Sequence, residues 1–213
     1  DQNISLEAHL TSLQRARFIR ERASVSDLGK EYMFLSALMR DAAYETLLSA
    51  QRSDLHREIA NYLEGLLTEN SASQYHGMIA YHYRQAGICH KELIHLLLAA
   101  KNNQRIYANE AAIREYQRAL VLLDELDTCQ EILSQVNINE SRLEVLSGLG
   151  TIYFGIGESA HAEQYFRSAI TVGRQMGLNV LELTRLFYWL GETLFWQNKF
   201  EEPIHLGEEG LYY

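Results

Sequence analysis

Proline, cysteine and long apolar runs are all scarce in this chain of 213 residues. Helix interiors exclude proline, whereas β-rich folds and long loops use it freely, so the single Pro203 favours an all-α fold. An apolar run such as Leu96 to Ala100 is far too short to span a membrane. The two cysteines, Cys89 and Cys129, lack the spacing of a disulfide framework or a zinc site. Because no apolar signal-peptide core opens the chain, it is predicted to be cytoplasmic, with two reduced thiols.

Basic charge is scarce as well. The formal net charge is −9 and the isoelectric point is about 5.4. Nucleic-acid binders usually carry a basic face, because phosphate neutralisation supplies much of their affinity. The local exception is a cluster of four arginines, Arg15, Arg17, Arg20 and Arg22. In the helical segment before it, residues 4–16, Arg15 is the one lysine or arginine, so solvated or domain-docking arginines are predicted, with no direct nucleic-acid partner.

No motif for catalysis or metal binding stands out. Gly150 and Gly155 are spaced like two glycines of a phosphate-binding loop. The Lys-Ser/Thr pair that such a loop needs does not follow, so these glycines are interpreted as helix-packing residues. No two histidines are four residues apart, the spacing that puts two imidazoles on one helical face. The closest pairs are His76/His82 and His90/His95. The sequence therefore predicts no catalytic residue, no metal and no cofactor.

Apolar spacing predicts helix along most of the chain. A helical pattern over residues 4–16 is followed by two short aromatic or β-branched runs around a polar stretch, which predict one hairpin within residues 18–35. Helical spacing then places Leu38 to Leu48 on one helix and Leu55 to Leu66 on the next. Further helices are predicted at 74–86, 89–104, 107–126, 139–155, 158–176, 179–197 and 200–212.

The polar stretch Thr68 to Ser73 is predicted to be a linker between two domains. Residues 1–70 would hold a helix, a hairpin and connecting helices, which is the arrangement of the second half of a winged-helix module. Residues 71–213 would form helical repeats. A start at Asp1 rather than at methionine indicates a piece of a longer protein.

The helical region contains an internal repeat. Leu149-Gly150 and Leu190-Gly191 lie 41 residues apart and align without a gap, and Gly157 aligns with Asn198. A small residue such as Gly150 lets two helices approach closely, so this position is predicted to be a helix contact.

The first of these segments resembles the tetratricopeptide repeat. In that family a large apolar residue, a Leu-Gly pair and a tyrosine mark the first helix, and alanine, an aromatic residue and alanine mark the second. The residues that match are Leu146, Leu149, Gly150, Tyr153, Gly157, Ala162, Phe166 and Ala169. Weaker matches lie at Ile79, Ala80, Tyr83, Gly87, Leu96 and Ala99, where Glu92 replaces a small residue, and at Ala112, Tyr116 and Ala119. The resemblance implies an α-solenoid of antiparallel helix pairs.

A second resemblance covers residues 4 to about 126. Tyr32 to Leu48, Arg52 to Ala60 and Ala80 to Gly87 look like segments of large bacterial signalling ATPases of the STAND/AAA type. In that family these segments follow a nucleotide-binding module and a winged helix, and many members carry a class III adenylyl cyclase or protein kinase domain. The resemblance implies a non-catalytic, protein-binding regulatory scaffold within such an ATPase. The alternative is the regulatory repeat domain of a MalT-like, ATP-dependent transcription activator.

A tetratricopeptide register also predicts a partner-binding surface, since the first helix of each pair lines the concave face. The residues on that face would be Glu144, Ser147, Thr151, Phe154, Arg185, Tyr188, Glu192 and Phe195. Aromatic and charged side chains on a concave face suit a protein or peptide partner, or another domain of the parent chain.

Aromatic residues are dense toward the end of the chain, at Tyr188, Trp189, Phe195, Trp196 and Phe200, and most are interpreted as core between helices. The chain then ends without a polar capping helix. Self-association through residues 187–213 is therefore predicted.

We predict that the chain binds duplex DNA no better than a generic acidic protein, because its net charge of −9 repels phosphate. The measurement is a fluorescence-anisotropy titration of labelled duplex at physiological salt. Micromolar binding that weakens steeply with added salt would contradict the prediction.

Overall fold

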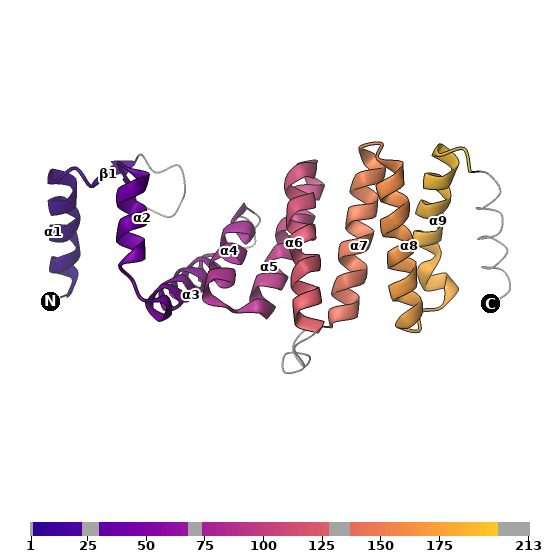
Figure 1. The fold of residues 1–213 in the computed structure, drawn as a ribbon, viewed down its shortest axis with the longest axis horizontal. Helices are drawn as coiled ribbons and strands as arrows, with labels where there is room; N and C mark the ends of the chain where they lie inside the picture. Colours follow the sequence, from indigo (N-terminus) through magenta and orange to yellow (C-terminus); the bar gives the residue numbers. More distant parts are fainter. Residues whose placement is uncertain (1, 23–29, 68–73, 128–136, 200–213) are drawn as a thin grey trace. The chain divides into compact units, whose positions relative to one another are not determined.

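The computed structural model describes residues 2–22, 30–67, 74–127 and 137–199 (Figure 1). Helices hold 79% of these residues, and the two strands among them form one small antiparallel hairpin. The mostly helical fold with a hairpin is thus confirmed. The chain divides into two units, residues 1–54 and 55–213, with the division inside a helix. The linker predicted at 68–73 and the helix predicted at 200–212 lie outside the described residues.

The first unit holds α1 (Gln2–Arg15), β1 (Ile19–Arg22), β2 (Glu31–Phe34), α2 (Ala37–Glu45) and the start of α3 (Ser49–Gly65). The strands pair with Ile19 opposite Phe34 and Arg22 opposite Glu31, which is where the sequence predicts the hairpin. Ile19 is the one buried side chain among those described in this unit, and α2 buries none. The four clustered arginines are all exposed.

The helix predicted to run through Leu48 ends at Glu45, which corrects the sequence prediction. The Arg52 guanidinium donates to the carbonyls of Glu45 and Leu47, at 3.2 and 2.9 Å, and so satisfies acceptors that a longer helix would use. The Gln51 side chain accepts a hydrogen bond from the Leu48 amide at 2.9 Å, as a helix-capping residue does. These side-chain hydrogen bonds therefore separate α2 from α3 between Glu45 and Ser49.

The apolar stripe predicted for α3 is largely exposed, which is a second correction. The side chains that α3 buries are His56, Ala60 and Leu63. The exposed members of the predicted stripe are Leu55, Ile59 and Tyr62 on α3 and Leu66 just after it. Polar contacts select the buried face, because His56 and Glu64 both reach across to neighbouring helices.

The second unit holds the rest of α3 and then α4 (His76–Ala86), α5 (Cys89–Arg105), α6 (Asn109–Asp127), α7 (Ile138–Gly155), α8 (Ser159–Gln175) and α9 (Val180–Trp196). From α4 onward each helix packs against the next, and α7 also contacts α5 and α9. Figure 1 shows α6, α7, α8 and α9 side by side. The bounds of these six helices agree with the sequence prediction to within two residues.

One type of turn recurs in the second unit. The residues with positive φ just after helices are Gly87, Tyr107, Gly157, Gly177 and Asn198. At each of them the next amide bonds back to a carbonyl five residues earlier, as Ile88 does to Tyr83 at 2.9 Å, which closes a Schellman motif. Gly157 and Asn198, which the 41-residue repeat aligns, share this left-handed conformation.

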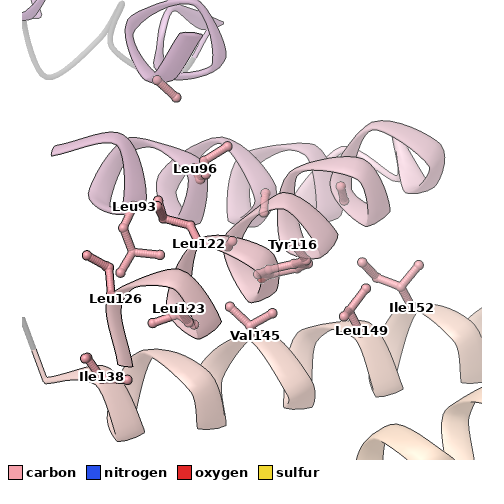
Figure 2. Packing of buried hydrophobic residues seen from close by; sticks show 14 residues of the cluster. Leu93, Leu96, Tyr116, Leu122, Leu123, Leu126, Ile138, Val145, Leu149 and Ile152 are labelled. Atoms are coloured by element: carbon pink, nitrogen blue, oxygen red, sulfur yellow. The ribbon is translucent and has the colours of Figure 1, made fainter. Parts of the chain in front are cut away.

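The helices α4 to α7 share one apolar core (Figure 2). Tyr116 lies near its centre, together with Leu93, Leu123, Val145 and Leu149, all at most 2% exposed. Helices α7 and α8 begin a second core, where Phe166 packs directly on Gly150. A Cβ atom on Gly150 would stand 2.6 Å from the Phe166 ring, so the sequence prediction that this glycine is a helix contact is confirmed.

A buried ion pair occupies the position where the repeat pattern expects a small residue. The Glu92 side chain of α5 is 3% exposed, and its Oε1 accepts a hydrogen bond from Arg118 of α6 at 2.8 Å. Arg118 also lies 3.5 Å from Glu125, which is exposed. The departure from the pattern at Glu92 is therefore offset by a cation from the next helix.

We predict that Gly150→Ala lowers the free energy of unfolding by about 1–3 kcal/mol, because the added methyl group overlaps the Phe166 ring. Gly155→Ala is the matched control, since nothing lies within 4 Å of its added methyl group, and it should change stability by less than about 1 kcal/mol. Urea unfolding followed by circular dichroism measures both values. Equal shifts for the two variants would contradict the helix contact at Gly150.

Candidate functional site

The second unit contains a pocket of about 490 Å³ between α5, α6, α7 and α9. Its lining residues are Lys101, Gln104, Tyr116, Glu144, Ser147, Gly148, Thr151, Arg185 and Trp189. Four residues of the predicted concave face, Glu144, Ser147, Thr151 and Arg185, thus lie together on one pocket. The residues that line the pocket come from four helices.

Tyr116 and Gly148 form one wall of the pocket. A Cβ atom on Gly148 would stand 2.6 Å from the Tyr116 ring, so this approach of α6 to α7 needs glycine. The Tyr116 hydroxyl donates to Gln104 Oε1 at 3.2 Å. Burial, with a smaller contribution from the charge of Glu144, raises the pKa of Tyr116 to about 12. Tyr116 is therefore a neutral, fixed wall at physiological pH.

The charges of the pocket are partly paired. Lys101 Nζ lies 3.0 Å from Glu144 Oε1, although the angle between them does not satisfy a hydrogen bond. That oxygen is buried and accepts no hydrogen bond from the described residues. Arg185 is exposed at the pocket and makes no ion pair with any residue in the described ranges. One guanidinium is therefore available to a ligand.

The hydroxyl groups of the pocket are limited to accepting hydrogen bonds. Ser147 Oγ donates to the Leu143 carbonyl at 2.6 Å, and Thr151 Oγ1 donates to the Ser147 carbonyl at 2.9 Å. Each hydroxyl has one hydrogen, so its remaining capacity is its lone pairs. The Gln104 amide nitrogen and the Arg185 guanidinium line the same pocket and are hydrogen-bond donors. Alternating donors and acceptors can bind peptide groups.

Trp189 gives the pocket its aromatic side. Its ring packs edge-on against Phe154 and Tyr188, with centroids 5.3 Å apart in each pair. Phe154 is half-buried in this contact, whereas Tyr188 is 57% exposed. The two remaining residues of the predicted face, Glu192 and Phe195, are half-buried and exposed on α9 and do not line the pocket.

The interpretation of the late aromatic residues as mostly core is wrong for three of them. Tyr188, Phe195 and Trp196 are 57%, 56% and 67% exposed, and Phe200 lies outside the described residues. These side chains project from α9, whose buried face consists of Leu183, Leu186, Leu190, Thr193 and Leu194. A helix of this composition has more apolar residues than one face can bury.

Sequence reasoning did not assign five of the lining residues to a site, namely Lys101, Gln104, Tyr116, Gly148 and Trp189. For Trp189 a signal exists, because it lies four residues after Arg185 and therefore on the same helical face. Lys101 and Gln104 lie at the end of α5, which the repeat pattern treats as the second helix of its pair. No spacing in the sequence places these two beside α7.

A second polar cluster links α3, α4 and α5. Glu64 Oε2 accepts hydrogen bonds from Tyr83 at 2.5 Å and Lys91 at 2.6 Å, while Oε1 lies 3.3 Å from His95 Nε2. Burial opposes ionisation of Glu64, but these hydrogen bonds and the Lys91 charge outweigh it and lower the pKa to about 2. Two pairs of histidines complete the cluster, His56 with His82 and His76 with His95.

The remaining sequence features can be located in the described residues. No group of three or more His, Cys, Asp or Glu side chains in those ranges could hold a metal ion. The four glycines between 148 and 157 lie on α7 and in the turn after it, as helix packing predicts. Among the helices that the structure describes, none is long and apolar enough to cross a membrane. Cys89 is half-buried with a free thiol, and Cys129 lies outside the described residues.

No protein-family model matches the chain, and no curated protein matches it in sequence. Among solved structures, the crystal structure of BtubC (BKLC) from P. vanneervenii is similar to this chain with a TM-score of 0.34. The sequence identity is 13%, over 83% of this chain and 77% of that one. A likeness this weak leaves function to be argued from the chain's own residues.

We predict that Lys101→Met changes the free energy of unfolding by less than about 1 kcal/mol, because the lysine is exposed and its pair with Glu144 is screened by solvent. Arg118→Met is the comparison, since it leaves Glu92 buried without its cation, and it should cost about 3 kcal/mol. Urea unfolding at neutral pH measures both. A cost for Lys101→Met as large as that for Arg118→Met would show that the pocket charge is structural.

Proposed function

We propose that this chain is a non-catalytic protein-interaction module that captures a peptide or a partner domain in the pocket between α5, α6, α7 and α9. The observation that carries the proposal is the convergence of Glu144, Ser147, Thr151 and Arg185 with Trp189 on one open pocket. An aromatic wall, an available guanidinium and several hydrogen-bond acceptors are what an extended peptide needs for recognition.

The helical array is proposed to be of the tetratricopeptide type. Support comes from the 41-residue alignment, whose glycine at 150 packs on Phe166 and whose turn residues Gly157 and Asn198 share one conformation. In such arrays the first helices of successive pairs line the binding face. Helices α7 and α9 are those helices here, and both contribute to the pocket.

The parent is proposed to be a cytoplasmic signal-transduction ATPase, possessing catalytic domains that this chain lacks. The α1 helix and the β1-β2 hairpin would be a winged-helix remnant that precedes the repeats in the sequence, and the repeats would report partner binding to the ATPase. The alternative parent is a MalT-like transcription activator. A cyclase or kinase domain elsewhere in the parent supports the first, and a helix-turn-helix supports the second.

Self-association is a second candidate for the chain's partner. It rests on the exposed apolar side chains of α9, with Leu181 83% and Trp196 67% exposed. The part of residues 187–213 beyond 199 lies outside the described ranges, so this remains a prediction. Light scattering of the chain over a wide concentration range measures it, and a strict monomer contradicts it.

We predict that a photo-crosslinking amino acid in place of Tyr188 forms a specific adduct with a partner in cells that produce the parent protein. Tyr188 contacts Trp189 and is exposed beside the pocket. Mass spectrometry of the adduct identifies the partner, and calorimetry with the purified partner fragment then measures affinity. Arg185→Glu should weaken that affinity at least tenfold, since it reverses the one available guanidinium.

The matched control places the same photo-crosslinker at Thr171, which is exposed on α8 and does not line the pocket. An adduct at 188 that is absent at 171 and lost on Arg185→Glu supports the proposal. The same adduct from both positions, or an affinity unchanged by Arg185→Glu, contradicts it.

A further inference from the structure

Four buried or half-buried imidazoles lie in two facing pairs at the start of the second unit. His56 Nδ1 of α3 lies 2.8 Å from His82 Nδ1 of α4. His76 Nδ1 of α4 lies 3.0 Å from His95 Nδ1 of α5. Within each pair the same ring atom faces itself, so one histidine must donate and the other must accept.

Glu64 determines which histidine of the second pair, His76 or His95, donates the hydrogen bond between them. Its carboxylate is ionised, because its pKa is held at about 2, and it can therefore only accept hydrogen bonds. His95 must then carry its hydrogen on Nε2, which faces Glu64 Oε1 at 3.3 Å. Neutral His95 is left with a lone pair on Nδ1, so His76 donates its Nδ1 hydrogen across the 3.0 Å gap.

This geometry limits how many protons the closed structure can hold. An imidazolium carries a hydrogen on both nitrogens. If both members of a pair were charged, two hydrogens would occupy a gap of 2.8 or 3.0 Å, which has room for one. Each pair can therefore hold at most one positive charge while its contact is intact.

Rotation of a ring out of its pair is obstructed by packing. His95 is 3% exposed and stacks on Tyr83, with centroids 5.6 Å apart. His56 and His76 are each 8% exposed. The Tyr81 ring packs edge-on against both His56 and His82. A second proton in a pair is therefore accommodated by separating the helices that carry it.

The charged and titratable groups around the four rings come from four helices. Among the described contacts they include Glu64 on α3, Tyr81 and Tyr83 on α4, Lys91 on α5 and Glu115 on α6. Glu64 favours a proton on His95 and Lys91 opposes it. Glu115 Oε1 lies 3.4 Å from the position of a Cβ atom on Gly77, next to His76. Burial raises the pKa of Glu115, so it contributes no loss of stability as the pH falls.

We propose that the two histidine pairs make α4 and α5 a proton-sensitive element, which opens as the pH falls below about 6. Lys101 and Gln104 lie on the last turns of α5, so opening removes one wall of the pocket. The opening itself is independent of the proposed function, and only its effect on a partner rests on that function.

The direction of the effect follows from proton linkage. Burial lowers the pKa of His56, His76, His82 and His95 below the value of 6.5 that an open chain would show. A lowered histidine pKa stabilises the closed form above pH 6.5, and this contribution is lost as the pH falls toward the closed-state pKa. The open form binds four protons at acid pH and the closed form at most two. The equilibrium constant for opening should therefore increase at least about 100-fold per pH unit below about pH 5.5.

The test is hydrogen exchange of the full chain between pH 7.5 and 4.5, corrected for the intrinsic pH dependence of exchange. Peptides from residues 76–105 should lose protection by about 100-fold or more, while peptides from α8 stay protected. Unchanged protection in residues 76–105, or an equal loss in α8, overturns the proposal.

The decisive variant is His76→Asn with His82→Asn, which puts a non-titrating amide in each pair while keeping a donor and an acceptor near the Nδ1 position. The loss of hydrogen-exchange protection in residues 76–105 at low pH should be at least tenfold smaller in this variant than in the unaltered chain. His161→Asn is the control, because His161 is exposed on α8, and it should respond like the unaltered chain. An undiminished response in the double variant overturns the proposal.

A variant that fails to fold still leaves a direct measurement on the unaltered chain. Proton NMR of the imidazole rings counts how many of the four histidines become charged while residues 76–105 remain protected. Two or fewer supports the limit of one charge per pair. Three or four charged histidines in the protected state overturn it.

Discussion

The close approach of helices to α7 is the constraint on which the rest of the second unit depends. Gly148 admits the Tyr116 ring of α6 on one side, and Gly150 admits the Phe166 ring of α8 on the other. These two positions are separated by about 200° around a helix, so α6 and α8 pack closely on opposite sides of α7. A methyl group at either position would overlap an aromatic ring, and both cores would have to move.

The same constraint shapes the candidate site. Tyr116 packs against Gly148, and its hydroxyl donates to Gln104, which joins α6 to α5 at this wall of the pocket. Ser147 and Thr151 flank that contact on α7 and return their hydrogens to the helix, which leaves acceptors toward the pocket. The side chains available to a partner are therefore those beyond the core contact, above all Arg185 and Trp189 on α9.

Much of this architecture could be predicted from the sequence. The features that could not be predicted depend on contacts between residues in different helices. Helix bounds and the contact at Gly150 follow from periodicity and from the size of side chains, which act locally. The end of α2 at Glu45 depends instead on the Arg52 side chain. Three of the nine residues that line the pocket come from α5 and α6, which no repeat register assigns to it. The histidine pairs could not be predicted for a related reason. Their members lie 26 and 19 residues apart on different helices, and spacing along one helix cannot show such contacts.

The departures from the repeat pattern concentrate in α3, α4 and α5, and they share one physical character. Glu92 is buried against Arg118, and Glu64 makes polar contacts with Tyr83, Lys91 and His95. An apolar core tolerates many arrangements, whereas a buried polar network is favourable only when every member is paired. These helices therefore have a well-defined closed state that should be sensitive to the loss of a single partner or to a second proton within one histidine pair. The contact of α7 with α8 at Gly150 is apolar and involves no such histidine pair, so the proposed response to pH should be confined to the start of the second unit.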